Sequence, residues 1–208
     1  MSYSREATKP DWYFSHVITI SSETGVGGTS TLSALYKHFA SDGKVRRISG
    51  GEIFKEFARE SGMTIGDFVR YCRLHPEELY DQKCDQTLAV YGSQNYTLIE
   101  GRLPHAFVPR GFHVLLTCDL ATRAKRRQKD PEYSIFDVGI VSSMIRDRDE
   151  HDVHRFGRLY LGCLWKSSDF DLVVSTEIFT PEQVASYIVK RHEKWRGDNC
   201  NIINNKIT

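Results

Sequence analysis

A short glycine-rich segment, residues 22–30, carries the residue types of this chain that are best suited to bind an anion. It follows a β-branched run and precedes a helical pattern. Glycines let several backbone N–H groups point towards one anion, and the first turn of a helix adds free donors and a positive dipole. A hydroxyl at the helix start can also contact Mg²⁺. The segment therefore predicts a phosphate-binding loop, with contacts from Gly25, Val26, Gly27, Gly28, Thr29 and Ser30.

This loop departs from the P-loop pattern G-x-x-x-x-G-K-[ST] at two positions. Ser22 stands at the first glycine and Gly28 at the lysine, whereas Gly27 and Thr29 match the pattern. The lysine places a positive charge on the β- and γ-phosphates, so an arginine elsewhere must supply that charge if phosphate is transferred. The alternative is a tight strand-to-helix turn that binds no ligand.

The elements that position this loop can be predicted from short apolar runs bounded by polar residues or glycine. Strands are expected at residues 17–21, 45–48, 97–100, 112–118 and 171–175. Two or three short helices should fill residues 52–92, and the charge-dense stretch 123–158 should be helical in pieces, as a solvated face or a lid. A final amphipathic helix begins at Pro181 and should end near Trp195.

Strands that alternate with helices predict a three-layer α/β fold of the P-loop NTPase type, with a five-stranded parallel sheet flanked by helices. The chain has 208 residues and is 40% hydrophobic, which suits one domain. We expect this domain to span residues 16–195, between a flexible N-terminus (1–15) and a flexible tail (196–208).

Composition limits the classes of partner. Lys and Arg number 28 against 27 Asp and Glu, so we expect neither nucleic acid nor a membrane as a partner. No signal peptide is visible, and no apolar stretch approaches the roughly 20 residues of a membrane span. The odd number of cysteines argues against a disulfide framework and for free thiols in the cytoplasm. They are Cys72, Cys84, Cys118, Cys163 and Cys200.

Several short motifs, taken in order, resemble the archaeal-type cytidylate kinases. They are residues 48–54 (ISGGEIF), 62–63 (GM), 75–77 (HPE) and 100–103 (EGRL), with Arg123, Arg126, Arg148, Asp152, Arg155, Tyr160 and the segment 168–172 further on. The resemblance covers about residues 16–192, and the ordered combination is specific although each motif is short. It implies a kinase with a monophosphate-binding region at 50–92 and a lid at 120–160.

The resemblance also implies transfer of the γ-phosphoryl group of ATP to CMP or dCMP. ATP and Mg²⁺ are then the expected cofactors, small nucleotides the expected partners, and a monomer or weak homodimer the expected state. Related sequences with Gly-Gly in this loop occur, so Gly28 does not exclude the chain from the group. Two further departures are Asp130, where the lid run should close on a basic residue, and residues 161–164, where an acidic residue is expected.

Phosphoryl transfer needs positive groups around both phosphates and the exclusion of water, so arginines of a closing segment are the expected catalysts. The candidates are Arg126, Arg148 and Arg155. Arg148 and Arg155 are seven positions apart, so one helix would project both to the same side, with Asp152 between them to orient a guanidinium. The alternative is an exposed helix with ordinary salt bridges.

The acceptor and metal sites are expected at the carboxyl edge of the sheet, where open α/β folds bind ligands. Arg102 is assigned to the acceptor phosphate, and Glu100 to Mg²⁺ through water, together with Thr29; a strand-terminal charge is the alternative for Glu100. Gly50, Gly51 and Glu52 would frame the acceptor at a helix start, unless they form an ordinary first turn.

Asp81 and Asp85 lie at an i, i+4 spacing, and their carboxylates can accept a hydrogen bond from the exocyclic amine of cytosine. A solvated helix face is the alternative. We favour an active (d)CMP kinase, and two rivals stay open. One is a silent nucleotide-binding or regulatory relative that lost the donor lysine, and the other is a kinase for another small acceptor, such as UMP or a non-nucleotide alcohol.

Overall fold

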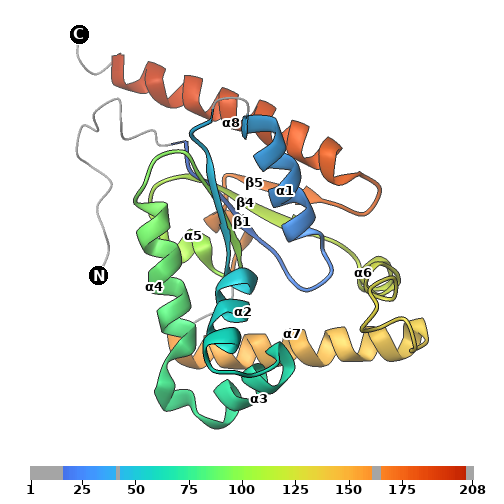
Figure 1. Cartoon of the computed structure of the whole chain (residues 1–208). Helices are drawn as coiled ribbons and strands as arrows, with labels where there is room; N and C mark the ends of the chain where they lie inside the picture. Colours follow the sequence, from blue (N-terminus) through green and yellow to red (C-terminus); the bar gives the residue numbers. More distant parts are fainter. Residues whose placement is uncertain (1–15, 41–42, 161–164, 205–208) are drawn as a thin grey trace.

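The computed structural model describes residues 16–40, 43–160 and 165–204. Its centre is a sheet of five parallel strands in the order β2-β3-β1-β4-β5 (Figure 1). The strands are β1 (Ile18–Ser21), β2 (Arg46–Ser49), β3 (Thr97–Gly101), β4 (Phe112–Thr117) and β5 (Leu172–Ser175). Each agrees with a predicted strand to within one residue at either end, so the predicted sheet is confirmed.

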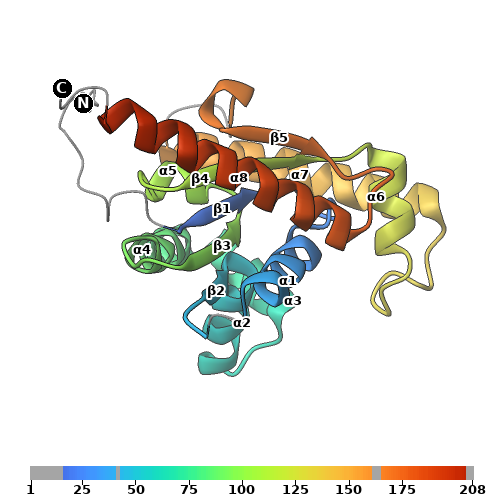
Figure 2. The same cartoon turned by 90° about the horizontal axis from the view of Figure 1, so that it is seen from above.

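Helices cover both faces of this sheet, with α1 and α8 on one side and α4 and α5 on the other (Figure 2). Their bounds are α1 (Gly28–Phe39), α2 (Gly50–Glu60), α3 (Ile65–Leu74), η3 (Pro76–Glu78), α4 (Tyr80–Gly92), α5 (Pro104–Phe107), α6 (Leu120–Arg127), α7 (Val138–Tyr160), η4 (Ser167–Asp169) and α8 (Pro181–Asn204). The predicted short helices between β2 and β3 are α2, α3 and α4. The predicted helical pieces of the charge-dense stretch are α6 and α7.

Two apolar clusters hold the layers together. Ile18 and Ile20 of β1 pack with Leu32, Leu35 and Ile188 between the sheet and the helices α1 and α8. All five are at most 1% exposed, and burying each such side chain contributes about 1.5–3 kcal/mol. The second cluster lies on the other face, against α2 and α4. Since helices cover both faces, the strands are apolar along most of their length.

Helix α8 differs from its prediction, because it continues to Asn204 rather than ending near Trp195. The predicted end of this helix is therefore wrong. Val184 and Ile188 anchor the helix in the core, and each added residue then gains a hydrogen bond, which offsets the low helix propensity of Asn and Gly. The predictions for residues 1–15, 161–164 and 205–208 lie outside the described part of the chain.

Two predictions from composition can also be compared with the structure. Cys72, Cys84 and Cys118 are free thiols, as expected, whereas Cys163 and the side chain of Cys200 lie outside the described part. No helix among the described residues has both the length and the apolar character needed to cross a bilayer.

Candidate functional site

The loop between β1 and α1 has a backbone suited to an anion. Gly25 and Gly27 have positive φ angles of 78° and 107°, which residues with a Cβ rarely adopt. Gly27 precedes α1 directly, so the first N–H groups of that helix are free of intrahelical partners at the loop. The Val26 side chain is fully buried, and its carbonyl oxygen accepts a hydrogen bond from Thr176 Oγ1 at 2.7 Å. The loop therefore has backbone N–H groups free to bind an anion, and Thr176, the residue that follows β5, holds it in place.

Side-chain oxygen atoms of Ser22, Thr29 and Glu100 lie close together beside the start of α1. The Thr29 side chain forms a hydrogen bond with the Glu100 carboxylate, and Ser22 Oγ donates to Glu100 Oε1 at 3.5 Å. Burial of the carboxylate raises the pKa of Glu100. No group of three or more His, Cys, Asp or Glu side chains in the described residues is arranged to hold a metal. Thr29 and Glu100 nevertheless fit Mg²⁺, a hard cation that takes few protein oxygens and completes its shell with water and phosphate.

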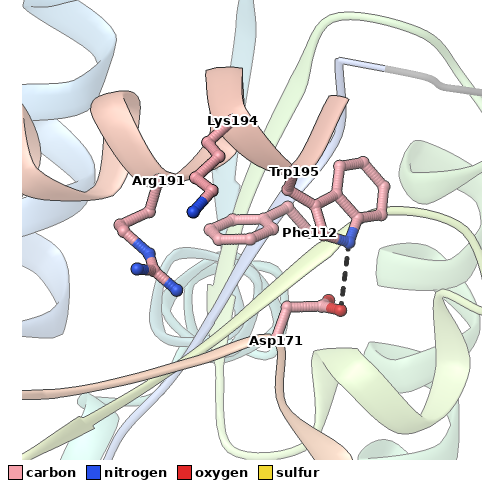
Figure 3. Close-up of a pocket in the computed structure, with 5 residues that line it drawn as sticks. All are labelled: Phe112, Asp171, Arg191, Lys194 and Trp195. Carbon is pink, nitrogen blue, oxygen red and sulfur yellow. Dashed lines mark hydrogen bonds between the residues drawn. The ribbon is translucent and has the colours of Figure 1, made fainter. Parts of the chain in front are cut away.

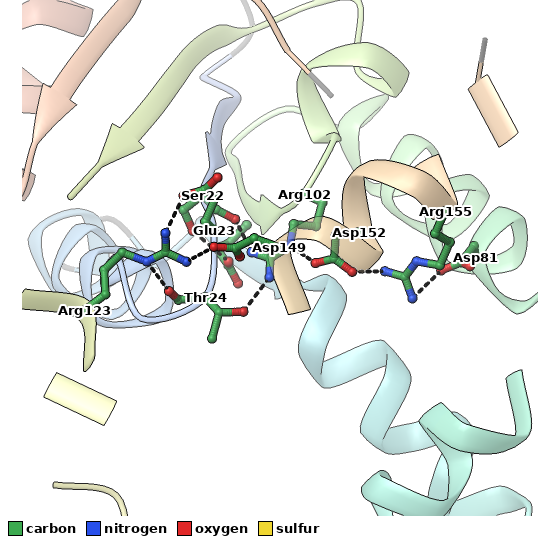
Figure 4. A network of polar contacts seen from close by, with 10 residues as sticks. Ser22, Glu23, Thr24, Asp81, Arg102, Arg123, Asp149, Asp152 and Arg155 are labelled. Carbon is green, nitrogen blue, oxygen red and sulfur yellow. Dashed lines mark hydrogen bonds and ion pairs between the residues drawn. The ribbon is translucent and has the colours of Figure 1, made fainter. Parts of the chain in front are cut away.

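A chain of ion pairs runs from this loop to α4 (Figure 4). Arg102 Nε donates to Asp152 Oδ2 at 2.8 Å, and Arg155 Nη2 donates to Asp152 Oδ1 at 3.0 Å. Arg155 also lies 3.5 Å from Asp81 Oδ1. At its other end, Arg102 donates to Thr24 Oγ1 at 2.6 Å. Asp152 thus orients Arg155, as its spacing predicted, and orients Arg102 as well.

Arg123 of α6 also contacts this loop (Figure 4). Its guanidinium donates to the Thr24 carbonyl oxygen at 2.7 Å and pairs with Glu23 and Asp149, both at 2.6 Å. The Arg123 residue is only 4% exposed, so this contact joins the loop, α6 and α7 firmly. Sequence reasoning missed Glu23, Thr24 and Asp149 as partners. The one available signal was the position of Asp149, three residues before Asp152 on the same helix face.

The neighbouring arginines of α6 also form hydrogen bonds or ion pairs within the protein. Arg126 donates to the Val26 carbonyl oxygen at 3.1 Å and to Thr176 Oγ1 at 3.0 Å, so its guanidinium is held against the back of the loop. Arg127 pairs with Asp130 at 2.7 Å. Asp130, one of the departures in the sequence, therefore pairs with an arginine of α6.

Arg148 is different from the other two predicted catalysts. Within the described residues, its guanidinium forms no hydrogen bond or ion pair. The side chain reaches solvent, yet enough protein surrounds it that desolvation, together with the nearby charge of Arg102, lowers the pKa of Arg148. A guanidinium that reaches solvent beside the charge of Arg102 can donate hydrogen bonds to an anion.

The predicted acceptor residues lie on α2 and α4. Gly50 and Gly51 open α2, and Ser49 Oγ accepts a hydrogen bond from the Glu52 backbone N–H at 3.1 Å, so Glu52 lies in a capped first turn. Asp85 is 8% exposed and accepts a hydrogen bond from the Tyr160 hydroxyl. Burial raises the pKa of Asp85 to about 6. Together with the Asp81–Arg155 pair, this burial contradicts the alternative of a solvated helix face.

A separate hollow lies at the opposite end of the sheet (Figure 3). It is lined by Phe112, Asp171, Arg191, Lys194 and Trp195. Phe112 begins β4 and Asp171 precedes β5, which places the hollow at the amino edge of the strands. The Asp171 carboxylate already accepts hydrogen bonds from Trp195 Nε1 and the His113 backbone. The predicted site residues all lie elsewhere.

The parallel sheet and the glycine loop before α1 define a protein of the P-loop α/β class. Solved structures agree with this fold. An uncharacterized protein from Eubacterium ventriosum has a TM-score of 0.62 at 16% identity, covering 86% of this chain and 98% of that one. Shikimate kinase from Acinetobacter baumannii has a TM-score of 0.56 at 15% identity, covering 96% of this chain and 100% of that one. At such identities the likeness shows the fold alone.

Sequence relatives specify the family. The cytidylate kinase of Thermococcus kodakarensis is 30% identical over 173 residues, which are 83% of this chain and 85% of that protein. The cytidylate kinase of Archaeoglobus fulgidus is 30% identical over 182 residues, with 85% and 94% covered. No family model matches the chain. The chain belongs to the cytidylate kinase family.

Proposed function

We propose that this enzyme transfers the γ-phosphoryl group of ATP to CMP or dCMP in the presence of Mg²⁺. The observation that carries the proposal is the unpartnered guanidinium of Arg148, which lies near Arg102. This guanidinium reaches solvent, so it is available to an anionic substrate. The names of the archaeal relatives support the choice of a cytidine nucleotide as acceptor.

On the donor side, the backbone of the glycine loop would hold the β- and γ-phosphates. The residues involved are Gly25, Val26, Gly27, Gly28, Thr29 and Ser30. Thr29 and Glu100 would hold Mg²⁺, which neutralises phosphate charge when bound. Arg126 fixes the loop from behind through the Val26 carbonyl oxygen, and it can reach the donor only if it exchanges these contacts.

On the acceptor side, Arg102 would bind the monophosphate. Its partner Asp152 holds the guanidinium in place before the nucleotide arrives, which lowers the entropic cost of binding. Gly50, Gly51 and Glu52 would frame the nucleotide at the start of α2. The carboxylates that would accept the cytosine amine are those of Asp81 and Asp85.

In the transfer step, a non-bridging oxygen of the acceptor phosphate forms a bond to the γ-phosphorus. The bond from that phosphorus to the β,γ-bridging oxygen breaks, and ADP leaves. Arg148 and Arg155, both on α7, would stabilise the charge on the transferring group, the main catalytic contribution in phosphoryl transfer. Closure of α6 and α7 would exclude water from this step.

A coupled assay of ADP release tests the proposal. The purified protein is given ATP and Mg²⁺ with CMP, dCMP, UMP or AMP in turn, and shikimate serves as a non-nucleotide acceptor. Turnover selective for CMP or dCMP is the expected result. Turnover with a different acceptor, or thermal stabilisation by nucleotides without any turnover, would overturn it in favour of one of the two rival functions.

A further inference from the structure

The side chains of Ser22 and Glu100 occupy the space where a side chain would start at Gly28, the residue at the P-loop lysine position. A Cβ atom built at this residue would lie 2.4 Å from Ser22 Oγ and 2.8 Å from Glu100 Oε1. Both distances are below 3.0 Å, and real Cβ atoms essentially never lie this close to another heavy atom. The stem of a lysine would therefore have to start inside the space that the Ser22 hydroxyl and the Glu100 carboxylate occupy.

The sheet explains why these two side chains meet there. Strands β1 and β3 are neighbours, with Ile20 opposite Glu100 and Ser21 opposite Gly101. The pairing continues for one residue beyond β1, because the Ser22 backbone N–H donates to the Gly101 carbonyl oxygen at 3.2 Å. Ser22 is 2% exposed, so its hydroxyl faces Glu100 across the end of the strands.

We propose that Ser22 is a positioning residue that is coupled to Gly28. Its hydroxyl occupies the start of the missing lysine stem and holds the Glu100 carboxylate beside Thr29. The two departures from the P-loop pattern, serine for the first glycine and glycine for the lysine, then form one arrangement. The role of Ser22 in positioning Glu100 and Thr29 for Mg²⁺ rests on the proposed function. The packing of Ser22 against Gly28 does not depend on that function.

One consequence concerns Gly28→Lys, the substitution that restores the lysine of the standard P-loop pattern. Gly28→Lys alone forces the Ser22 hydroxyl to rotate and to break its contact with Glu100. The lysine should fit only when Ser22 is also replaced by glycine, the residue of the standard pattern. Gly28→Lys by itself should therefore lower both the melting temperature and the turnover, and Ser22→Gly should restore most of the lost thermal stability.

A double-mutant cycle without nucleotide tests the coupling. The melting temperature Tm is measured for the parent, Ser22→Ala, Gly28→Ala and the double variant. Gly28→Ala should lower Tm by about 3 °C or more in the parent. In the Ser22→Ala background, where the hydroxyl is gone and Glu100 can turn away, the same change should cost less than about a third of that. Equal losses in both backgrounds would overturn the proposal.

Gly66 provides the matched control for this cycle. It is also a first-turn helix glycine, at the second position of α3, and a Cβ there meets only Thr64 Oγ1, at an ordinary 3.9 Å. Gly66→Ala should shift Tm equally with and without Ser22→Ala. Should Gly28→Ala give no folded protein, recovery of folding by Ser22→Ala supports the coupling, and continued failure to fold contradicts it.

Metal affinity supplies a second measurement, one that a purely structural role of Ser22 would not change. With saturating ATP, Mn²⁺ as a substitute for Mg²⁺ should bind about 10-fold more weakly to Ser22→Ala, because groups that orient metal ligands tune metal affinity by at least this factor. ATP binding in EDTA should stay the same. Unchanged Mn²⁺ affinity would refute the positioning role. Because the Tm cycle needs neither acceptor nor turnover, its result is independent of the proposed kinase activity.

Discussion

Arg102 Nε donates a hydrogen bond at 2.8 Å to the carboxylate of Asp152, fifty positions further along the chain. The contact ties the end of β3 to the middle of α7, which crosses below the sheet (Figure 1). The second oxygen of the same carboxylate accepts a hydrogen bond from Arg155. One buried acid thus orients two guanidinium groups, one near the glycine loop and one near α4, before any substrate binds.

Asp152→Asn should destabilise the protein. The side chain is only 7% exposed and pairs with both arginines. Loss of its charge therefore breaks the ion pair of Arg102 and leaves Arg155 dependent on its 3.5 Å contact with Asp81. Removal of one partner from a buried ion pair typically costs about 3 kcal/mol, and we expect a loss of this size in urea unfolding. Glu150→Gln, an exposed change on the same helix, should stay within about 0.5 kcal/mol. Equal effects of the two changes would contradict this assignment.

The sheet and the loop could be predicted from sequence because their signals are local. Each strand is a short apolar run, and Gly25 and Gly27 mark a turn that needs positive φ angles. The ion-pair partners could not be predicted in the same way. Arg123 meets Glu23 across 100 positions, and no local pattern shows which of several acids will pair with which arginine.

The assignment of catalytic arginines shows the same limit. Spacing placed Arg148 and Arg155 on one face of a helix, and α7 does contain both. Asp152 lies within four residues of both arginines, and sequence could not show that it pairs with Arg155 and not with Arg148. Nor could it show the second partner of Arg155, Asp81 of α4. The catalytic role of Arg126 stays a prediction, since its present contacts are to the loop backbone and Thr176.

Arg148→Ala should remove activity without a loss of stability. Because the guanidinium forms no hydrogen bond or ion pair among the described residues, its removal breaks no such interaction, and the free energy of unfolding should stay within about 0.5 kcal/mol. Loss of one charge on the transferring phosphoryl group should lower kcat by about 100-fold or more. Arg148→Lys should recover only part of kcat, because an ammonium lacks the planar fork.

The control for this change is Arg146→Ala, an exposed arginine on the same helix. It should leave kcat within about twofold of the parent, since surface changes away from a site have small effects. A stability loss in Arg148→Ala that accounts for its lower turnover would show that the residue is structural.

Asp85 should make the protein less stable as the pH rises through the acid range. Burial raises the pKa of its carboxyl from 3.8 to about 6, so in this window the folded state binds the proton more tightly than the unfolded state. Stability from this group is therefore present below the unfolded pKa and is lost as the pH passes the folded pKa. Asp85→Asn removes the titration, while its amide oxygen can still accept from the Tyr160 hydroxyl.

Urea unfolding at about pH 4 and about pH 7 measures this effect. The stability of Asp85→Asn relative to the parent should be higher at the upper pH by about 2 kcal/mol. Asp147→Asn, on the exposed side of α7, should differ from the parent by less than about 0.5 kcal/mol at either pH. The same relative stability of Asp85→Asn at both pH values would show that Asp85 is not buried as described.

His105 should produce the opposite trend. Burial lowers the pKa of this imidazole from 6.5 to about 4; its Nδ1 lies 3.1 Å from Ser21 Oγ, and its ring packs on Phe170. Below about pH 6.5 the unfolded chain binds the proton more readily, so stability from the neutral imidazole falls as the pH drops towards 4. His105→Asn keeps a polar group near the Ser21 hydroxyl but cannot titrate.

Chemical unfolding at about pH 7.5 and about pH 5 tests this difference. His105→Asn should lose about 1 kcal/mol at the higher pH through weaker packing, and it should lose less stability than the parent on acidification. His154→Asn, on the exposed face of α7, serves as the control and should follow the parent. If His105→Asn and the parent lost equal stability between the two pH values, the proton would be binding elsewhere, with His192 as the next candidate, because burial lowers the pKa of that imidazole to about 4 as well.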